Sequence, residues 1–200
     1  MIKKQNYLKH AIVLFLLLLL MQPGRALAAY ENVEFSSLTN HDGLTNSQVG
    51  AILKDTRGYI WFGTHSGLCR FDGFRMKTFY YSNTDDKSLP NNTVDELQQD
   101  YDGNIWVHTS VGYSIYKYDE EQFDRKPEEW LKNIHVQGPP YKLLIDKDKN
   151  MWIAVYGQGL YYHNAKTRNT YLFKFTKKAQ PGCLKEGNIS KITEVDGDAL

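Results

Sequence analysis

The sequence predicts an all-β protein built of β-propeller blades, each a sheet of four antiparallel strands. Three observations predict this fold class. Aromatic residues make up 14% of the chain, and planar side chains pack well on pleated sheets. Three segments align with one another at a fixed period, which indicates a repeat protein. Within each segment, short apolar runs of period two are broken by turn residues, as in strands joined by hairpins.

Three tryptophans mark the period of the repeat. Trp61, Trp106 and Trp152 are separated by 45 and 46 residues, and each follows a short acidic turn. A single four-stranded blade cannot bury both of its faces, so stacked repeats must form the core. We therefore expect the tryptophans to pack between blades. The alternative, a sugar-stacking platform, is less consistent with their recurrence in phase with the repeat.

The first copy shows the order of the elements. We expect strands over residues 49–54, 59–63, 68–72 and 75–80. A turn at residues 55–58 joins the first two strands, because Asp satisfies its own backbone and Gly58 tolerates a left-handed φ; Gly103 holds the same place in the second copy. Four strands in about 45 residues is the size of a propeller blade. An insertion at residues 126–133 predicts a helical turn on the rim.

The repeat divides the chain into three complete blades and the start of a fourth. The blades are expected at about residues 44–80, 89–126 and 136–176, and the fourth begins at about 187–200. Its first strand is expected after Gly187, its first turn at residues 196–198, and its second strand from Ala199. Propellers typically need about four to eight blades to close. Residues 29–200 are thus predicted to be an incomplete propeller, and the chain an amino-terminal piece of a longer protein.

Residues 1–28 predict a cleaved signal peptide. Lys3, Lys4 and Lys9 give a positive start, residues 11–21 are uniformly apolar, and residues 26–28 (Ala-Leu-Ala) suit a signal peptidase. An apolar run of 11 residues is short of the about 20 that span a bilayer. We therefore expect the rest of the chain to be exported.

Charge and cysteine content exclude two classes of function. The leader holds four of the 24 basic residues, so 20 basic residues remain against 23 acidic ones, a net charge of −3. A mildly acidic chain lacks the clustered basic face that nucleic acids require, so no direct nucleic-acid contact is expected. Cys69 and Cys183 are far apart in sequence and are expected to remain unbonded, without a metal or redox motif.

The first copy resembles a known repeat family. Residues 43–49 (GLTNSQV), 55–64 (DTRGYIWFGT) and 67–74 (GLCRFDGF) are similar to the two-component regulator propeller repeat, and residues 88–94 (SLPNNTV) repeat the pattern that leads into its blades. The resemblance extends from about Val33 to the end. The second copy departs from it at His108 and Val111, and the third has Ala154 and Val155 in place of Gly-Thr.

The resemblance implies a function in signalling. It implies the periplasmic sensor region of a hybrid two-component histidine kinase of Bacteroidetes, anchored in the inner membrane and responding to an oligosaccharide. Further blades and signalling domains of the same protein would be its partners, and a homodimer is left open. No kinase motif lies within these residues, so any kinase activity is implied by the family alone.

No motif in the chain predicts a catalytic residue, a metal site or a cofactor. The turns that begin at Asp100 and Asp146 imitate the start of an EF-hand loop but lack its Gly and its bidentate Glu. Ser66 is one place too late for a nucleophile elbow and stands between strands. No histidine pair has the spacing of a zinc helix. The segment is therefore predicted not to be an enzyme.

One face of the propeller is the expected binding surface. Loops that lead into the first strand of each blade and loops that join the second and third strands crowd one face around the axis. Short polar groups beside aromatics suit a neutral, hydroxyl-rich ligand. The candidate residues are Asn46, Ser47, Thr64, His65, Asn91, Asn92, Thr109, Ser110, Tyr156 and Gln158. Two alternatives remain: a secreted propeller enzyme, lyase or hydrolase, that acts on glycans, and a structural or protein-interaction propeller.

Overall fold

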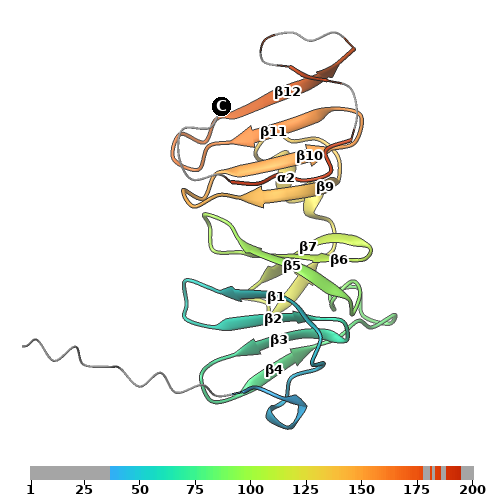
Figure 1. Cartoon of the computed structure of the whole chain (residues 1–200), viewed down its shortest axis with the longest axis vertical. Helices are drawn as coiled ribbons and strands as arrows, with labels where there is room; N and C mark the ends of the chain where they lie inside the picture. Colours follow the sequence, from blue (N-terminus) through green and yellow to red (C-terminus); the bar gives the residue numbers. More distant parts are fainter. Residues whose placement is uncertain (1–36, 178–180, 182, 186–187, 195–200) are drawn as a thin grey trace, which may run out of the picture. The chain divides into compact units, whose positions relative to one another are not determined.

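A computed structural model describes residues 37–177, 181, 183–185 and 188–194. The predicted signal peptide and the predicted turn at residues 196–198 lie outside the described residues. In the part of the chain that is described, no helix is long and apolar enough to span a membrane. Within these residues, three sheets of mainly antiparallel strands follow one another in chain order (Figure 1).

Each sheet is a propeller blade in which consecutive strands are neighbours. The first sheet contains β1 (Val49–Lys54), β2 (Ile60–Thr64), β3 (Gly67–Phe71) and β4 (Met76–Phe79). The second contains β5 (Val94–Gln99), β6 (Ile105–Thr109), β7 (Gly112–Lys117) and β8 (Gln122–Asp124). The third contains β9 (Pro140–Ile145), β10 (Met151–Val155), β11 (Gly159–His163) and β12 (Thr170–Thr176), with β13 (Leu184–Lys185) parallel to β12. The predicted fold class is confirmed.

Two short helices accompany the sheets within the described residues. A 3-10 helix, η1 (Asn40–Asp42), precedes β1. The insertion in the second repeat forms α2 (Pro127–Lys132), which confirms the predicted helical turn. Proline at the start of α2 suits the helix because its missing N–H would have no partner there. Leu131 of α2 is fully buried in the core between the second and third sheets.

The same turn joins the first two strands of all three sheets. Gly58 and Gly103 have φ of 92° and 86°, and Lys149 takes the equivalent place in the third sheet with φ of 66°. The N–H of each donates to the carbonyl oxygen three residues earlier, at 2.9–3.1 Å. Glycine adopts this left-handed conformation without a steric cost, whereas lysine does not. The third turn is therefore the most strained of the three.

An aspartate in each turn fixes the tryptophan that marks the repeat. Asp100 Oδ1 accepts the N–H groups of Asp102 and Asn104 at 3.0 and 2.9 Å, and its Oδ2 accepts Trp106 Nε1 at 2.9 Å. The corresponding Nε1 to Oδ2 distances are 2.6 Å for Trp61 with Asp55 and 3.3 Å for Trp152 with Asp146. One carboxylate therefore closes the turn and orients the indole that follows it.

The core lies between neighbouring sheets. Trp61 is buried against Phe79 of its own sheet and Tyr116 of the second, with 5.0 Å between the Trp61 and Tyr116 ring centroids. Trp106 is buried with Ile153 of the third sheet in the same way. Trp152 is half-buried, and the rings that it contacts belong to its own sheet.

The described residues of the predicted fourth blade contain no strand. Residues 188–194 form no strand, although Ile189 N donates to Tyr141 Oη at 2.9 Å and so lies beside β9. In the three sheets, the first strand pairs with the second. The predicted second strand of the fourth repeat would begin at Ala199, outside the described residues. Both cysteines are unbonded, as predicted, with Cys69 buried in β3.

Candidate functional site

Two of the candidate binding residues form hydrogen bonds within the turns that follow β2 and β6. Thr64 and Thr109 are fully buried, and their hydroxyls donate to the carbonyl oxygens of Gly67 and Gly112 at 2.8 and 3.0 Å. Each hydroxyl also accepts an N–H within its turn. These two threonines shape the loops and do not present a hydroxyl to the surface.

Three asparagines also have local partners. Asn46 Nδ2 donates to Ser66 Oγ at 2.9 Å, so the loop before β1 is joined to the loop after β2. Asn91 Oδ1 accepts Thr93 N at 2.8 Å, and Asn92 Oδ1 accepts Tyr81 N at 2.7 Å. In contrast, Ser47, His65 and Ser110 are exposed.

A cavity of about 370 Å³ lies between the second and third sheets on the predicted binding face. Its walls come from the β6–β7 turn, β7, the start of α2, the segment leading into β9 and the β10–β11 turn. We call it the seam cavity; its lining includes His108, Tyr113, Pro127, Glu128, Tyr141 and Tyr156. Of the candidate residues, Tyr156 lines it and the others do not.

Tyr141 and Tyr156 form a stacked aromatic pair at the seam cavity. Their ring centroids are 4.0 Å apart with planes inclined by 22°, and Tyr156 is 64% exposed. The register of β9 shifts at Tyr141, between Lys142 and Pro140. Such an irregularity re-aims the side chain of the extra residue, and here it directs Tyr141 toward the β10–β11 turn. The pair therefore presents a flat apolar face to solvent.

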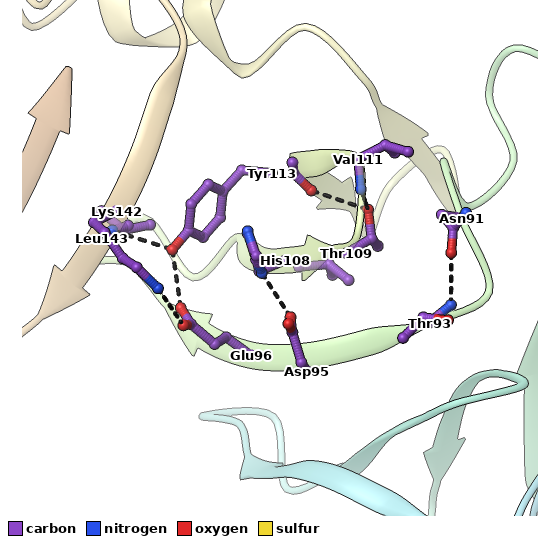
Figure 2. A network of polar contacts seen from close by, with 12 residues as sticks. Asn91, Thr93, Asp95, Glu96, His108, Thr109, Val111, Tyr113, Lys142 and Leu143 are labelled. Carbon is purple, nitrogen blue, oxygen red and sulfur yellow. Dashed lines mark hydrogen bonds and ion pairs between the residues drawn. The ribbon is translucent and has the colours of Figure 1, made fainter. Parts of the chain in front are cut away.

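Strand β5 has a register shift like that of β9, between Val94 and Glu96. It places Asp95 beside His108. Figure 2 shows this contact, in which His108 Nδ1 lies 2.6 Å from Asp95 Oδ1. The His108 ring is 4.4 Å from the ring of Tyr113. In the first sheet the two equivalent positions are Gly50 and Gly63, and a Cβ at Gly63 would lie only 2.6 Å from Val94. The second sheet thus carries a polar pair where the first sheet has only backbone.

Tyr113 connects the seam cavity to the junction of the two sheets. Its hydroxyl donates to Glu96 Oε2 at 2.9 Å and accepts Leu143 N of β9 at 3.1 Å (Figure 2). Lys142 Nζ is 3.4 Å from the other Glu96 oxygen. Burial and the adjacent Glu96 carboxylate raise the pKa of Tyr113, so the phenol stays protonated and can donate.

Gln98 adds a second connection between β5 and β9. Its Nε2 donates to Leu143 O at 2.9 Å and its Oε1 accepts Ile145 N at 2.6 Å. An amide side chain thereby satisfies the open edge of β9 as another strand would. Together with Tyr113, it fixes how the two strands that flank the seam cavity are aligned.

A second cavity, of about 600 Å³, lies at the outer part of the third sheet. It is lined by His135, Gln137, Gln158, Tyr161 and residues of β12, including Tyr171. The candidate Gln158 belongs here, with Nε2 donating to Gln137 O at 2.7 Å and Oε1 accepting the Tyr161 hydroxyl. Among the described residues, no group of three His, Cys, Asp or Glu is placed to hold a metal ion.

A family model, "Two component regulator propeller", matches residues 43–66 and 88–110. These two segments are similar to the two-component regulator propeller repeat. The two matched segments contain eight of the ten candidate residues. These residues lie just before the first strand and at the end of the second strand of the first and second sheets. His108 of the seam cavity lies within the second matched segment, and the other residues that line the cavity follow that segment.

Individual proteins are also similar to the chain. Histidine kinase P4 of Formosa agariphila is 41% identical over 61 residues, which are 30% of this chain and 4% of that protein. Two solved structures are extracellular domains of hybrid two-component systems of B. thetaiotaomicron, BT3049 and BT4673. Both are 18% identical, with TM-scores of 0.34 and 0.39; they cover 69% and 70% of this chain, which spans 26% and 27% of theirs.

Sequence reasoning missed Asp95, Tyr113 and Tyr141 as site residues. A signal for two of them was present in the alignment of the repeats. The positions equivalent to Gly50 and Gly63 are Asp95 and His108 in the second repeat and Tyr141 and Ala154 in the third. In the second blade the side chains at these two positions, Asp95 and His108, are in contact.

Proposed function

We propose that this chain is the extracytoplasmic, ligand-sensing part of a hybrid two-component sensor, and that it binds an oligosaccharide in the seam cavity. The observation that carries the proposal is the stacked pair of Tyr141 and Tyr156, of which Tyr156 is 64% exposed. Aromatic faces beside a few polar groups are typical of small-ligand sites. The cavity volume of about 370 Å³ lies at the lower end of the range for such sites, about 300–1,000 Å³.

The polar groups around the cavity favour a hydroxyl-rich ligand. Glu128 offers acceptors at the start of α2, and the His108–Asp95 pair lies beside Tyr113 on the other side. The Arg125 guanidinium, which also reaches the cavity, donates to carbonyl oxygens of Ser82, Asp85 and Leu89. A strongly anionic ligand would therefore find its nearest cation already engaged.

The proposed signalling role is supported by the two matched repeats and by the similar histidine kinase. Residues 43–66 and 88–110 match the two-component regulator propeller, and a histidine kinase shares 41% identity over 61 residues. We infer that the propeller lies in the periplasm, that the complete protein is held in the inner membrane, and that further blades and a cytoplasmic kinase are its partners within one polypeptide. The segment itself binds and does not catalyse.

Titration calorimetry of the full chain against a panel of neutral oligosaccharides tests the proposal. We expect a member of the panel to bind, with an affinity that changes little between low and high salt, because the cavity does not present a free charge cluster. Failure of every neutral oligosaccharide to bind, or loss of most affinity at high salt, would contradict it. Breakdown of the bound sugar would favour the alternative of a secreted lyase or hydrolase.

A further inference from the structure

His163, at the end of β11, is a buried histidine between the third and second sheets. Its exposed fraction is 1%. The imidazole lies 5.5 Å from the ring of Tyr101, which belongs to the β5–β6 turn of the second sheet. Histidine is the side chain whose ordinary pKa, about 6.5, lies closest to neutral pH. A histidine that is buried in a junction between sheets can therefore couple their packing to pH.

The hydrogen bonds around His163 determine which ring nitrogen carries the proton. Thr170 Oγ1 donates to Ile134 O at 2.6 Å, so the one hydroxyl proton is already used. His163 Nδ1 is 2.8 Å from the same oxygen. Nδ1 must therefore donate to Thr170, which leaves the lone pair on Nε2. Nε2 is buried and has no hydrogen-bond partner among the described residues.

This chain of hydrogen bonds crosses the junction between the sheets. Thr170 belongs to β12 of the third sheet, whereas Ile134 follows α2 and is buried in the core with Leu131 and Trp106. Thr170 is thus held between an imidazole of its own sheet and a carbonyl of the neighbouring segment. Displacement of the imidazole would remove the donor to the Thr170 hydroxyl, which is the group that attaches β12 to the segment after α2.

The charged groups near His163 do not favour the binding of a second proton to its imidazole. Arg168, in the turn after β11, lies with its guanidinium 3.9 Å from the Tyr101 ring centroid and 3.5 Å from Asp102 Oδ1. Burial and the positive charge of Arg168 lower the pKa of His163, and Asp102, itself paired with Arg168, opposes this only in part. Met151, opposite His163 on β10, carries no charge.

We propose that His163 makes the junction of the second and third sheets sensitive to acid, because the sheets dock fully only while the imidazole is neutral. A proton on Nε2 would place a donor in a buried site without an acceptor, beside Arg168. Such a group leaves the site or opens its surroundings. The residues expected to loosen are those around Ile134 and Thr170.

The direction of the pH effect follows from the lowered pKa. Below about pH 6.5 the unfolded chain binds a proton at His163 that the folded chain does not, so the folded state loses stability as the pH falls. Above that pH both states are neutral, and the contribution is fully present. In the acid window the equilibrium constant for opening rises by up to about tenfold per pH unit.

Hydrogen exchange of the full chain at pH 7.5 and 5.5, corrected for intrinsic rates, tests this. We expect faster exchange at residues 130–136 and 159–176 at pH 5.5 in the natural chain. His163→Asn keeps a donor for Thr170 but cannot titrate, so it should remove most of that increase. The matched control is His135→Asn, because His135 is exposed in the neighbouring segment and its φ of 62° is one that Asn tolerates.

Equal acid-induced exchange in His163→Asn and the natural chain would overturn the proposal, as would exchange in the natural chain that does not change with pH. If His163→Asn does not fold, nitrogen NMR of labelled histidine in the natural chain decides the question. A neutral, Nδ1-protonated ring that persists well below pH 6.5 supports the proposal. A ring that titrates at the ordinary pKa, about 6.5, contradicts it.

Discussion

At the scale of single residues, the fixed distance between an aspartate and the following tryptophan explains how each blade begins. Asp55, Asp100 and Asp146 each stand six residues before a tryptophan and accept its indole N–H. Charge-assisted bonds of this kind are roughly twice as strong as neutral ones. The tryptophan is therefore oriented by its own turn as well as by the residues that pack on it.

Asp100→Asn tests this pairing. Asp100 is 2% exposed and accepts N–H groups on both oxygens, so an amide would direct a donor at other donors. We expect a loss of about 1 to 3 kcal/mol in the free energy of unfolding, measured by urea denaturation. Asp148→Asn, at an exposed site in the equivalent turn of the third sheet, should change it by less than about 0.5 kcal/mol. Equal effects would contradict the pairing.

Tyr113→Phe removes the hydroxyl but keeps the aromatic ring that lines the seam cavity. The change leaves Leu143 N without its partner and should lower the free energy of unfolding by about 1 to 3 kcal/mol. Tyr162→Phe in the third sheet, at a half-buried site, is the control. If thermal melting of Tyr113→Phe matched that of the natural chain, the hydroxyl would not connect β7 to β9.

At the scale of elements, strands and turns could be predicted from local pattern, whereas the site could not. The expected first strand, residues 49–54, is β1 itself, because alternation and turn residues act over a few positions. The pairing of Tyr141 with Tyr156, or of Asp95 with His108, depends on the irregular register of the first strand and on the junction between sheets. Neither is visible in hydrophobic periodicity.

Helix α2 shows how an insertion can contribute to the core. Leu131→Ala should cost about 2 to 5 kcal/mol in unfolding free energy, because Leu131 is fully buried with Trp106 between two sheets. Glu129→Ala removes an exposed ion pair with Lys132 and should cost less than about 0.5 kcal/mol. Denaturation of both variants checks this. A small effect of Leu131→Ala would mean that α2 lies on the surface only.

At the scale of the whole molecule, stability arises between the sheets. Trp61→Ala and Trp106→Ala should each lower the free energy of unfolding by about 3 to 5 kcal/mol, since both indoles are buried against the following sheet. Trp152→Ala, at a half-buried site, should cost roughly 1 to 2 kcal/mol. Calorimetric melting of the three variants measures the difference, and equal losses would contradict packing between sheets as its cause.

The central claim is that the ligand occupies the seam cavity, and two exposed tyrosines allow a direct test. Tyr156 lines the seam cavity and is 64% exposed, whereas Tyr171 lines the outer cavity of the third sheet and is 53% exposed. With an oligosaccharide that binds the natural chain, titration calorimetry should show at least about tenfold weaker binding for Tyr156→Ala, or about 1.4 kcal/mol, and unchanged binding for Tyr171→Ala. The reverse result, or no effect of Tyr156→Ala, would contradict the account.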